Sequence, residues 1–240
     1  MFKYSNKTAV VTGASRGIGK AIATTLANNG MQVIGIATSE KSLDTIRDIK
    51  NIIPFCCNIS DEKSIEDLYA FVKEHSSNID ILVNNAGIGR MAFLEQLSVK
   101  DMRLVMETNF LSHAITTKVF LPMLKRQQQL VDIVFTGSEA ALEGARQGSI
   151  YCASKFAVRG FVQAIREECA KTRVRVSIVN PGAVRTPFFD DLHFEPGGAS
   201  ENAIEAEDVA KVLLTILNAR PGTVIDEINL SPQTHVWQRK

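Results

Sequence analysis

Short runs of apolar and β-branched residues alternate along this chain with longer stretches in which apolar residues recur three and four positions apart. Most of the short runs are continuously apolar, which is typical of strands covered on both faces. The predicted strands are residues 8–12, 32–37, 52–56, 79–83, 131–136, 174–179 and 224–228. The longest predicted helix covers residues 99–125. Strands that alternate with helices are typical of βαβ units, so the pattern predicts an α/β fold with a parallel sheet.

No linker, charge block or internal repeat divides the chain, so residues 1–240 are expected to form a single domain around one sheet. The weakest pattern is in residues 181–205, which are rich in Pro, Gly, Asp and aromatic side chains. A loop of that length in a compact domain is usually functional, and we expect it to contribute to a substrate site.

Composition narrows the class of partner. With 45% hydrophobic and 22% charged residues, the chain of 240 residues can bury a sizeable core. Its 27 Lys and Arg side chains and 26 Asp and Glu side chains leave a formal net charge of +1. A nucleic acid or an anionic membrane surface requires a basic face, which this balance does not indicate. The expected partner is therefore a small molecule.

The N-terminus and the cysteines indicate the compartment. The first seven residues hold no apolar run of a secretory signal, and no apolar run elsewhere approaches the length of a membrane span. The four cysteines and four histidines show no spacing typical of metal ligands. We therefore expect free thiols, a cytoplasmic protein, no metal and no membrane association.

A glycine-rich segment, TGASRGIG, follows the first predicted strand and opens a helix. Glycines let the backbone turn tightly and approach a pyrophosphate, while the helix N-terminus supplies unpaired N–H groups and a positive dipole end. The alternative is an ordinary tight turn between strand and helix, but the strand–turn–helix context favours phosphate binding. The residues expected to bind are Gly13, Ser15, Arg16, Gly17, Ile18 and Gly19.

The end of the second strand discriminates between dinucleotides. An acidic residue there would bind the ribose 2′-hydroxyl of NAD, whereas a 2′-phosphate favours basic or hydroxyl side chains. The sequence places Thr38 at this position, with Arg16 in the glycine-rich segment, and this favours NADP(H) over NAD(H). Two other interpretations remain open: Glu40 reaches the ribose, or it is only a solvated charge at the start of a helix.

A second group of residues carries acid–base chemistry. Tyr151 and Lys155 are four positions apart at the start of a predicted helix, so both can point into the same cleft. Ser138 follows the fifth strand, and the segment Asn84-Asn85-Ala86-Gly87 follows the fourth. Both lie at the carboxyl edge of the sheet, where ligands bind in open α/β folds.

These segments together resemble the short-chain dehydrogenase/reductase family in order and spacing, from about residue 7 to residue 230. The resemblance implies a doubly wound Rossmann-type sheet with helices on both faces, a nicotinamide cofactor and a catalytic tetrad of Asn109, Ser138, Tyr151 and Lys155. It also implies cofactor contacts from Asn58, Ile59, Asn85, Ala86, Gly87, Tyr151, Lys155, Pro181, Gly182, Val184 and Thr186. Many members carry Asp after the third strand, where this chain has Cys57-Asn58-Ile59.

The tetrad suits the interconversion of a carbonyl and a secondary alcohol, which needs a proton delivered to or removed from the reacting oxygen. Tyrosine titrates near pH 10, and one ammonium at about 4 Å in a medium of dielectric about 20 contributes about 4 kcal/mol. Lys155 is therefore expected to be sufficient in principle to lower the pKa of Tyr151, with the positive charge of the oxidised nicotinamide adding to its effect. Ser138 would hold the substrate oxygen, and Asn109 resembles the family residue that kinks its helix and holds a proton-relay water.

Substrate specificity is expected from residues 187–194 and 139–150. Phe188, Phe189 and Phe194 either form an apolar pocket wall or only pin the loop to the body of the protein. One alternative substrate is a 3-oxoacyl-[acyl-carrier-protein], with Lys125, Arg126, Lys171 and Arg173 as candidates for the basic rim that carrier binding requires. An alternative of another class is a non-catalytic NADP-binding sensor on the same fold.

The resemblance also implies assembly as a homodimer or homotetramer through the long helices at about residues 99–125 and 151–170. The polar tail, residues 233–240, carries the only tryptophan, Trp237. We expect this tail either to pack across a partner subunit or to fray.

Overall fold

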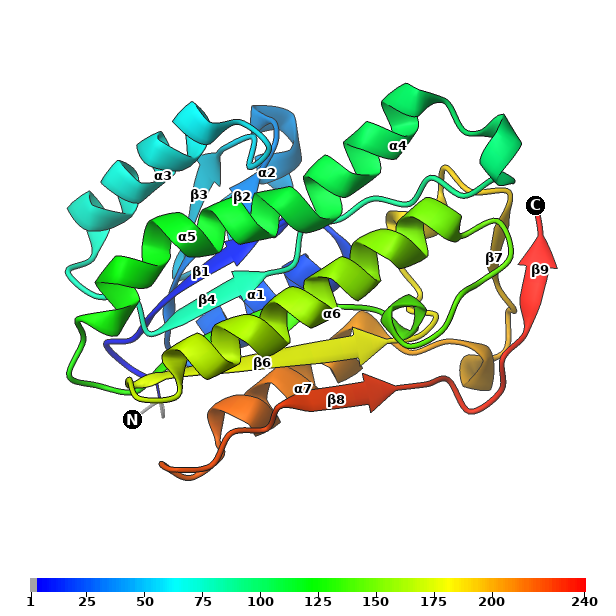
Figure 1. The fold of residues 1–240 in the computed structure, drawn as a ribbon. Helices are drawn as coiled ribbons and strands as arrows, with labels where there is room; N and C mark the ends of the chain where they lie inside the picture. The colour runs from blue at the N-terminus through cyan, green and yellow to red at the C-terminus, as the bar shows by residue number, and fades with distance from the viewer. Residues whose placement is uncertain (1–3) are drawn as a thin grey trace.

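The computed structural model describes residues 4–240, so the first three residues of the N-terminal segment considered above lie outside the described part. Its main sheet has seven strands in the order β3-β2-β1-β4-β5-β6-β8, and every neighbouring pair is parallel (Figure 1). The strands are β1 (Thr8–Thr12), β2 (Gln32–Ala37), β3 (Ile52–Cys56), β4 (Ile81–Asn84), β5 (Val131–Thr136), β6 (Val174–Pro181) and β8 (Glu227–Leu230). The predicted α/β fold with a seven-stranded parallel sheet is confirmed.

Four of the seven strands have the predicted bounds, and three are shifted. β4 begins two residues later than predicted, β6 continues to Pro181, and β8 begins at Glu227 rather than at residue 224. Side chains bind the segment that leads into β8. The carbonyls of Thr223 and Asp226 accept hydrogen bonds from Arg175 and Arg166, at 3.3 and 2.8 Å. These arginines therefore hold the segment before Glu227, where the carbonyl of Asp226 also accepts a backbone hydrogen bond from Ile178 of β6 at 3.1 Å.

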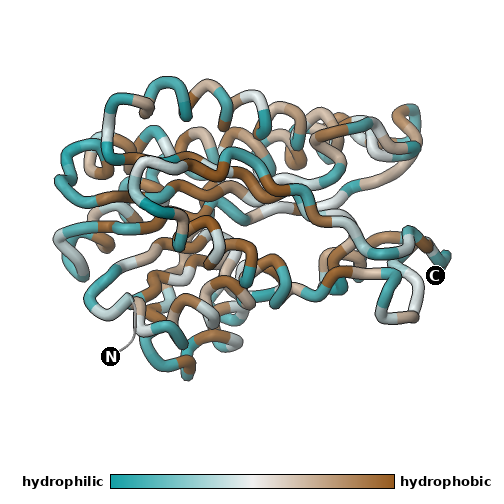
Figure 2. The backbone as a smooth tube through the Cα atoms, turned by 90° about the horizontal axis from the view of Figure 1, so that it is seen from below, coloured by the Kyte–Doolittle hydropathy of each residue, from teal (hydrophilic) through white to brown (hydrophobic). Residues whose placement is uncertain are grey.

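Helices cover both faces of the sheet, and each face has its own apolar core. The helices α1 (Gly17–Asn28), α2 (Glu40–Arg47) and α7 (Ala206–Leu217) contribute to one cluster of buried residues. The helices α3 (Glu62–His75), α5 (Ser112–Lys125) and α6 (Ser149–Cys169) contribute to the other. Figure 2 shows hydrophobic stretches running through the middle of the molecule, with hydrophilic segments in many of the outer turns.

The long helix predicted over residues 99–125 is one helical rod with an internal irregularity. It consists of α4 (Val99–Met106), a π-helical turn (Glu107–Leu111) and α5. Asn109 lies in the π-helical turn and is fully buried. π-turns are frequent at functional sites because they redirect side chains within a helix. The irregularity therefore marks the place where this rod passes the carboxyl edge of the sheet.

The C-terminal tail is ordered within the chain. Residues Trp237–Arg239 form β9, which pairs antiparallel with β7 (Phe194–Pro196) of the loop that follows β6 (Figure 1). The expectation that the tail frays is therefore wrong, because these residues are paired within their own chain. The same loop contains two short 3₁₀ turns, Pro187–Phe189 and Ser200–Asn202, so it is more ordered than its composition suggested.

No helix among residues 4–240 combines the length and apolarity that a membrane span requires. Within the same residues, no group of three or more His, Cys, Asp or Glu side chains is placed to hold a metal ion. The four cysteines are free thiols, and three of them are buried.

Candidate active site

The glycine-rich turn between β1 and α1 forms one end of a cleft. Gly13 and Gly17 adopt φ values of +66° and +52°, a region that side chains with a Cβ rarely occupy. A Cβ on Gly19 would lie 2.1 Å from the carbonyl oxygen of Gly13, so only glycine permits this close backbone approach. The N-cap of α1, Arg16, makes no side-chain hydrogen bond to the helix. The open helix N-terminus and the glycine backbone together fit the pyrophosphate of a dinucleotide.

The segment after β4 is held against this turn by hydrogen bonds. Thr12 Oγ1 accepts from the backbone N–H groups of Asn85 and Ala86, at 2.9 and 3.1 Å. The side chain of Asn85 donates to the Thr12 carbonyl at 3.0 Å. The two loops are thereby fixed side by side, and a Cβ on Gly13 would meet Ala86 Cα at 2.9 Å.

His113 supports this segment from behind, a role that no sequence motif indicated. Its Nε2 lies 2.7 Å from the carbonyl oxygen of Ala86, and because a carbonyl only accepts, Nε2 carries the proton. Burial, with the nearby Lys155 charge, lowers the pKa of His113 to about 3, so the ring is neutral. His113 is four residues after Asn109, and this spacing places the two side chains on one side of the rod. The spacing was the only feature of the sequence that could have indicated the role of His113.

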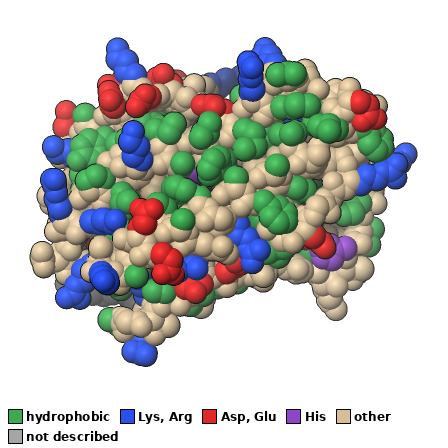
Figure 3. All heavy atoms as spheres, viewed as in Figure 1, with side chains coloured by type: hydrophobic (Ala, Val, Ile, Leu, Met, Phe, Trp, Pro, Cys, Tyr) green, Lys and Arg blue, Asp and Glu red, His purple; other side chains and the backbone are tan. Residues whose placement is uncertain are grey.

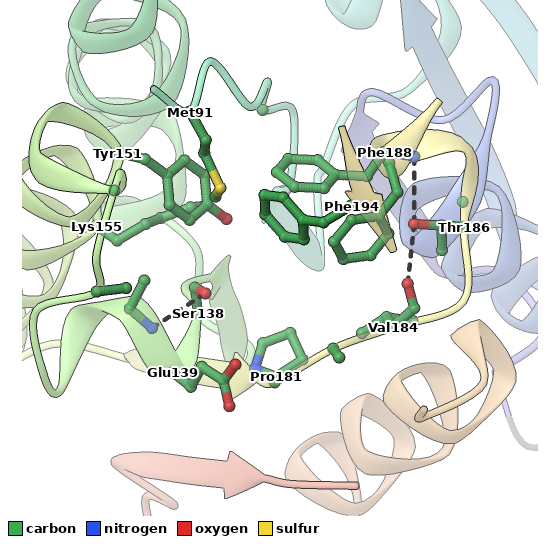
Figure 4. A pocket seen from close by; sticks show the side chains of 18 of the residues that line it. Met91, Ser138, Glu139, Tyr151, Lys155, Pro181, Val184, Thr186, Phe188 and Phe194 are labelled. Carbon is green, nitrogen blue, oxygen red and sulfur yellow. Dashed lines mark hydrogen bonds between the residues drawn. The ribbon is translucent and has the colours of Figure 1, made fainter. Parts of the chain in front are cut away.

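The four residues of the predicted tetrad come from three elements at the carboxyl edge of the sheet. Ser138 follows β5, Asn109 lies in the π-helical turn, and Tyr151 and Lys155 lie on the first turns of α6. All four are buried, with exposed fractions of 8%, 0%, 8% and 3% respectively. Figure 4 shows Ser138, Tyr151 and Lys155 gathered on one side of the pocket.

Each of these side chains has defined partners. The hydroxyl of Tyr151 shares a hydrogen bond with Ser138, whose oxygen also accepts from the N–H of Ala140 at 3.2 Å. Lys155 Nζ donates to the carbonyl of Thr136 at 3.0 Å and lies 5.9 Å from the centre of the Tyr151 ring. The serine is thus both a local turn cap and a neighbour of the phenol.

The amide side chain of Asn109 makes hydrogen bonds to two other segments of the protein. Its amide nitrogen donates to the carbonyl of Ile88 and to Ser154 Oγ, at 3.0 and 3.2 Å. Its Oδ1 accepts from the N–H of Ile88 at 2.9 Å. Asn109 therefore ties the segment after β4 to helix α6, which carries Tyr151 and Lys155.

Burial dominates the electrostatics of the site. It raises the pKa of Tyr151 to about 12, while the hydrogen bond from Ser138 acts in the opposite direction. Burial also lowers the pKa of Lys155 to about 8. The expectation that Lys155 alone would lower the phenol pKa is wrong for the protein's own groups. Burial penalises the phenolate, and it also destabilises the ammonium that would stabilise it.

The segment after β6 forms another wall of the cleft, next to the glycine-rich turn. Thr186 Oγ1 donates to the carbonyl of Val184 at 3.2 Å and accepts from the N–H of Phe188 at 3.4 Å (Figure 4). A Cβ on Gly17 would meet Thr186 Cβ at 3.2 Å, so this segment packs directly on the glycine-rich turn. The three segments enclose a cavity of about 880 Å³.

Most of the predicted site residues line this cavity. They are Gly13, Arg16, Gly17, Ile18, Gly19, Asn85, Ala86, Gly87, Ser138, Tyr151, Lys155, Pro181, Gly182, Val184 and Thr186. Ser15, Thr38, Asn58, Ile59 and Asn109 lie outside its lining. Of these, Thr38 and Asn58 are exposed at the ends of β2 and β3, and Ile59 is part of the apolar core.

The structure adds lining residues that the sequence did not single out. Glu139 follows Ser138, and burial raises the pKa of its carboxyl. Its Oε2 lies 3.9 Å from His235 Nδ1, so the tail reaches this part of the cleft. Trp237 to Lys240 line the cavity as well. In the sequence, the only sign that the tail lines the cavity was a tryptophan in an otherwise polar segment.

The basic rim considered for a carrier protein lies elsewhere. Lys125 is the last residue of α5, before β5 begins, and Arg173 directly precedes β6. Both therefore lie at the amino edge of a sheet whose carboxyl edge holds the cavity. Lys125 Nζ donates to the carbonyl of Glu168 at 3.2 Å, near the end of α6. The expectation that these residues form a rim beside the cleft is wrong.

Comparison with known proteins gives consistent results. Residues 7–195 match the family described as short chain dehydrogenase. A farnesol dehydrogenase of Aedes aegypti is 31% identical, over 97% of this chain and 98% of that protein. A 3-oxoacyl-[acyl-carrier-protein] reductase of Haemophilus influenzae is 35% identical, over 91% of this chain and 93% of that protein.

Solved structures agree over nearly the whole chain. An alcohol dehydrogenase from Thermococcus sibiricus, complexed with 5-hydroxy-NADP, has a TM-score of 0.85 and 29% identity, covering 96% of this chain and 98% of that one. A short-chain dehydrogenase/reductase from Burkholderia phymatum, in complex with NAD, has a TM-score of 0.84 and 26% identity, covering 95% and 90%.

Proposed function

Because the chain belongs to the short-chain dehydrogenase/reductase family, whose members are NAD(P)-dependent oxidoreductases, we propose that it interconverts a carbonyl compound and a secondary alcohol with NADP(H). One observation carries the proposal. A single cavity has a glycine-lined helix N-terminus at one end and Ser138, Tyr151 and Lys155 at the other. A dinucleotide held by its phosphates at the first end would extend towards the proton donor at the second.

The residues that would hold the dinucleotide fit it. Gly13, Gly17 and Gly19 leave backbone space that a Cβ would fill, and the open N-terminus of α1 offers N–H groups to phosphate oxygens. Val184 and Thr186 line the cavity between the glycine-rich turn and the tetrad. When bound, the nicotinamide supplies or accepts the hydride.

The chain's own residues handle the proton. Tyr151, protonated at neutral pH, donates its proton to the carbonyl oxygen during reduction, and Ser138 holds that oxygen by a hydrogen bond. Lys155 places a positive charge beside the phenol, which stabilises the phenolate left after proton transfer. Asn109 is a positioning residue because it fixes helix α6 against the segment after β4.

The pH dependence of carbonyl reduction should follow Lys155. Its pKa is lowered to about 8, so its positive charge is present below that pH and is lost above it. We expect kcat/KM for the carbonyl to be level below about pH 8 and to fall by about tenfold per pH unit above it. Steady-state rates in overlapping buffers measure this profile.

Lys155→Met provides the matched control, since it removes the titrating group and keeps an unbranched side chain. This variant should be less active, and its profile should lack the limb near pH 8. A limb that persists unchanged in Lys155→Met would show that another group titrates.

The cofactor preference rests on the end of β2. Thr38 and Arg16 are exposed near the N-terminus of α1, and no acidic residue directly follows β2. Glu40, the alternative ribose ligand, accepts a hydrogen bond from Arg47 at 3.1 Å on the surface of α2. This pairing supports a site for a 2′-phosphate rather than for a 2′-hydroxyl.

We expect NADPH to bind at least about tenfold more tightly than NADH, a difference of about 1.4 kcal/mol. Thr38→Asp should remove this preference, because its carboxylate repels a 2′-phosphate and accepts from a 2′-hydroxyl. Titrations monitored by nucleotide fluorescence give both dissociation constants. Thr215→Asp, the same substitution at an exposed position on α7, is the control. Tighter binding of NADH by the unmutated protein would contradict the proposal.

The whole chain is proposed to act as one catalytic domain in the cytoplasm. Residues 181–205, the proposed substrate loop, pack against the glycine-rich turn and pair with the C-terminal tail, so they belong to the same body as the nucleotide end. The four free thiols suit a reducing compartment.

Assembly as a homodimer or homotetramer is proposed through the face formed by α4, α5 and α6. Figure 3 shows hydrophobic side chains gathered on this face. Leu104, Leu111 and Phe156 are 40%, 39% and 44% exposed there. Apolar side chains grouped in this way are typical of protein interfaces. Sedimentation of the purified chain tests the proposal.

Reduction of a 3-oxoacyl-[acyl-carrier-protein] is the second candidate, favoured by the 35% identity to the Haemophilus influenzae reductase. The basic residues considered for carrier binding lie at the amino edge of the sheet, away from the cavity. A panel of ketones, diketones, keto acids and 3-oxoacyl thioesters, assayed by NADPH oxidation, separates the two candidates.

A further inference from the structure

The last residues of the chain run along the substrate loop as a strap, defined here as residues 234–240. Its backbone pairs with the loop in several places. Thr234 N–H donates to the carbonyl of Glu201 at 2.9 Å, and Lys240 N–H donates to that of His193 at 3.0 Å. Between them, Trp237 is paired with Pro196 in the β7–β9 ladder. The strap is therefore fixed by backbone hydrogen bonds at both ends and in the middle.

Side chains anchor the end of the strap. Lys240 Nζ donates to the carbonyl of Phe189 at 2.6 Å and lies 3.6 Å from a carboxylate oxygen of Glu195. Gln238 donates to the other oxygen of Glu195 at 2.9 Å. The end of the chain is thus connected to the 3₁₀ turn that carries Phe188 and Phe189.

A continuous row of aromatic rings connects the strap with the proton donor. Trp237 lies 5.8 Å from Phe189 and 5.3 Å from Phe194, between ring centres. Phe189 lies 5.3 Å from Phe188, which in turn lies 5.7 Å from Tyr151. These distances are typical of stabilising aromatic pairs. The row therefore extends from the strap to the ring that carries the catalytic hydroxyl.

These rings form one wall of the substrate end of the cavity. Figure 4 shows Phe188 and Phe194 on one side, facing Met91 and Tyr151 across the pocket. Trp237 also lines the cavity, and 46% of its surface remains exposed, so part of the indole is free to contact a ligand. All three phenylalanines line the cavity, and Phe189 is in addition buried, so that it also holds the loop in place.

Three polar side chains that line this end of the cavity, His193, His235 and Arg146, lie close to other groups of the protein. His193 Nε2 lies 3.2 Å from Gln147 Oε1, and His235 lies 3.9 Å from Glu139. The guanidinium of Arg146 lies over the ring of Phe93, at 5.1 Å. The contact surface offered next to the reacting oxygen is therefore mainly aromatic and thioether, which suits an apolar substituent.

Resting on the proposed carbonyl–alcohol chemistry, we propose that Trp237, held in place by the strap, lines the substrate pocket and is a specificity-determining residue for carbonyl compounds with a bulky apolar substituent. The indole closes the end of the aromatic wall and contacts that substituent. A small carbonyl compound reaches Ser138 and Tyr151 without touching the strap.

The kinetic test compares two α-diketones that share a reacting group, 1-phenylpropane-1,2-dione and butane-2,3-dione. Trp237→Ala should raise KM for the phenyl compound by about tenfold, because aromatic contact and apolar burial are lost. KM for butane-2,3-dione, kcat for both compounds and NADPH affinity should change less than about twofold, since the strap lies away from the reacting atoms.

Val236→Ala is the matched control. Val236 neighbours Trp237 on the strap and is similarly exposed, at 41%, but it packs towards Gly197 and does not line the cavity. It should leave both KM values unchanged. A KM ratio for the two diketones that is the same in Trp237→Ala and in the unmutated enzyme would overturn the proposal.

A binding measurement separates this inference from the proposed reaction. Trp237 is the only tryptophan of the chain, so tryptophan emission reports directly from the strap. Addition of 1-phenylethanol to the NADPH complex should change the emission saturably, whereas propan-2-ol should not. A saturable change without turnover of any carbonyl supports the pocket and contradicts the reaction. Diketone turnover with no emission change for 1-phenylethanol overturns the role of Trp237 and leaves the reaction standing.

Discussion

Replacement of Tyr151 by phenylalanine is expected to reduce carbonyl turnover by about 10³-fold or more, at the upper part of the range for loss of a general acid. The substitution removes the hydroxyl bonded to Ser138, while the ring keeps its packing against Phe188. Single-turnover oxidation of NADPH measures the chemical step directly. The loss should therefore appear in the rate constant of that step.

Binding of NADPH is the internal control for this variant. The glycine-rich turn lies at the other end of the cavity, so the dissociation constant of NADPH should change by less than about twofold. Unchanged turnover in Tyr151→Phe would contradict the catalytic assignment. Glu139 is the next group to test in that case, because it is a buried acid of raised pKa in the same cleft. In that case, Glu139→Gln should show the loss of turnover that Tyr151→Phe does not.

The same experiment separates an enzyme from a nucleotide sensor. A sensor that binds NADPH needs the glycine-rich turn but no proton donor, so Tyr151→Phe would leave its function intact. The geometry favours catalysis. Three groups that can move or stabilise a proton, Ser138, Tyr151 and Lys155, are held together in a buried site where each is costly to maintain.

The bounds of a strand could be predicted from the sequence where they depend only on the residues of that strand. β1 is a continuous apolar run with polar ends, β5 is apolar apart from Asp132 and its last residue, and the bounds of both strands were predicted to the residue. β8 begins later than predicted, and the segment before it is bound by Arg175 and Arg166, which are distant in sequence and donate to the carbonyls of Thr223 and Asp226. Periodicity contains no information about such contacts.

Non-local contacts also explain what was missed at the site. β7 and β9 have three residues each, too few to show a pattern, and they are stable only because they pair with each other. His113 acts on Ala86, 27 residues earlier, through packing that only the fold reveals. The position of Lys125 could have been inferred, since a helix end that precedes a parallel strand lies at the amino edge.

The electrostatic error has a different origin. The pKa of Tyr151 was expected to fall because Coulomb attraction to Lys155 was counted without the burial of either group. In the structure both are almost fully buried, and burial moves both pKa values towards the neutral forms. The positive charge of an oxidised nicotinamide would act in the direction that the phenolate requires.

Arg175→Met is expected to destabilise the fold by about 3–5 kcal/mol, because it leaves a buried carboxylate without its partner. Arg175 and Asp132 lie on neighbouring strands and are 5% and 7% exposed. Two hydrogen bonds join them, of 2.7 and 2.8 Å. Burial raises the pKa of Asp132 in spite of this pairing, so the carboxylate is costly to bury even with the arginine present.

Arg175 also caps the segment that leads into β8. It donates to the carbonyls of Ala219 and Thr223 at 3.0 and 3.3 Å, and to that of Leu217 at 3.4 Å. The double variant Asp132→Leu/Arg175→Met should recover part of the lost stability by removing the unpaired charge. It should remain about 1–3 kcal/mol below the unmutated protein, because these carbonyls lose their donor.

Urea unfolding of the single and double variants at neutral pH gives the coupling energy. Asp132→Leu alone should cost less than Arg175→Met, since the arginine keeps its carbonyl partners whereas the carboxylate does not keep a cation. If Arg175→Met lowers the free energy of unfolding by less than about 1 kcal/mol, the account is contradicted. A loss that small is typical of solvent-exposed ion pairs, not of a buried pair. The strands that present Ser138 and Pro181 to the cavity are β5 and β6, which this pair joins at their opposite ends. Arg175→Met should therefore lower the thermal stability of the protein at temperatures where KM of the folded enzyme is unchanged.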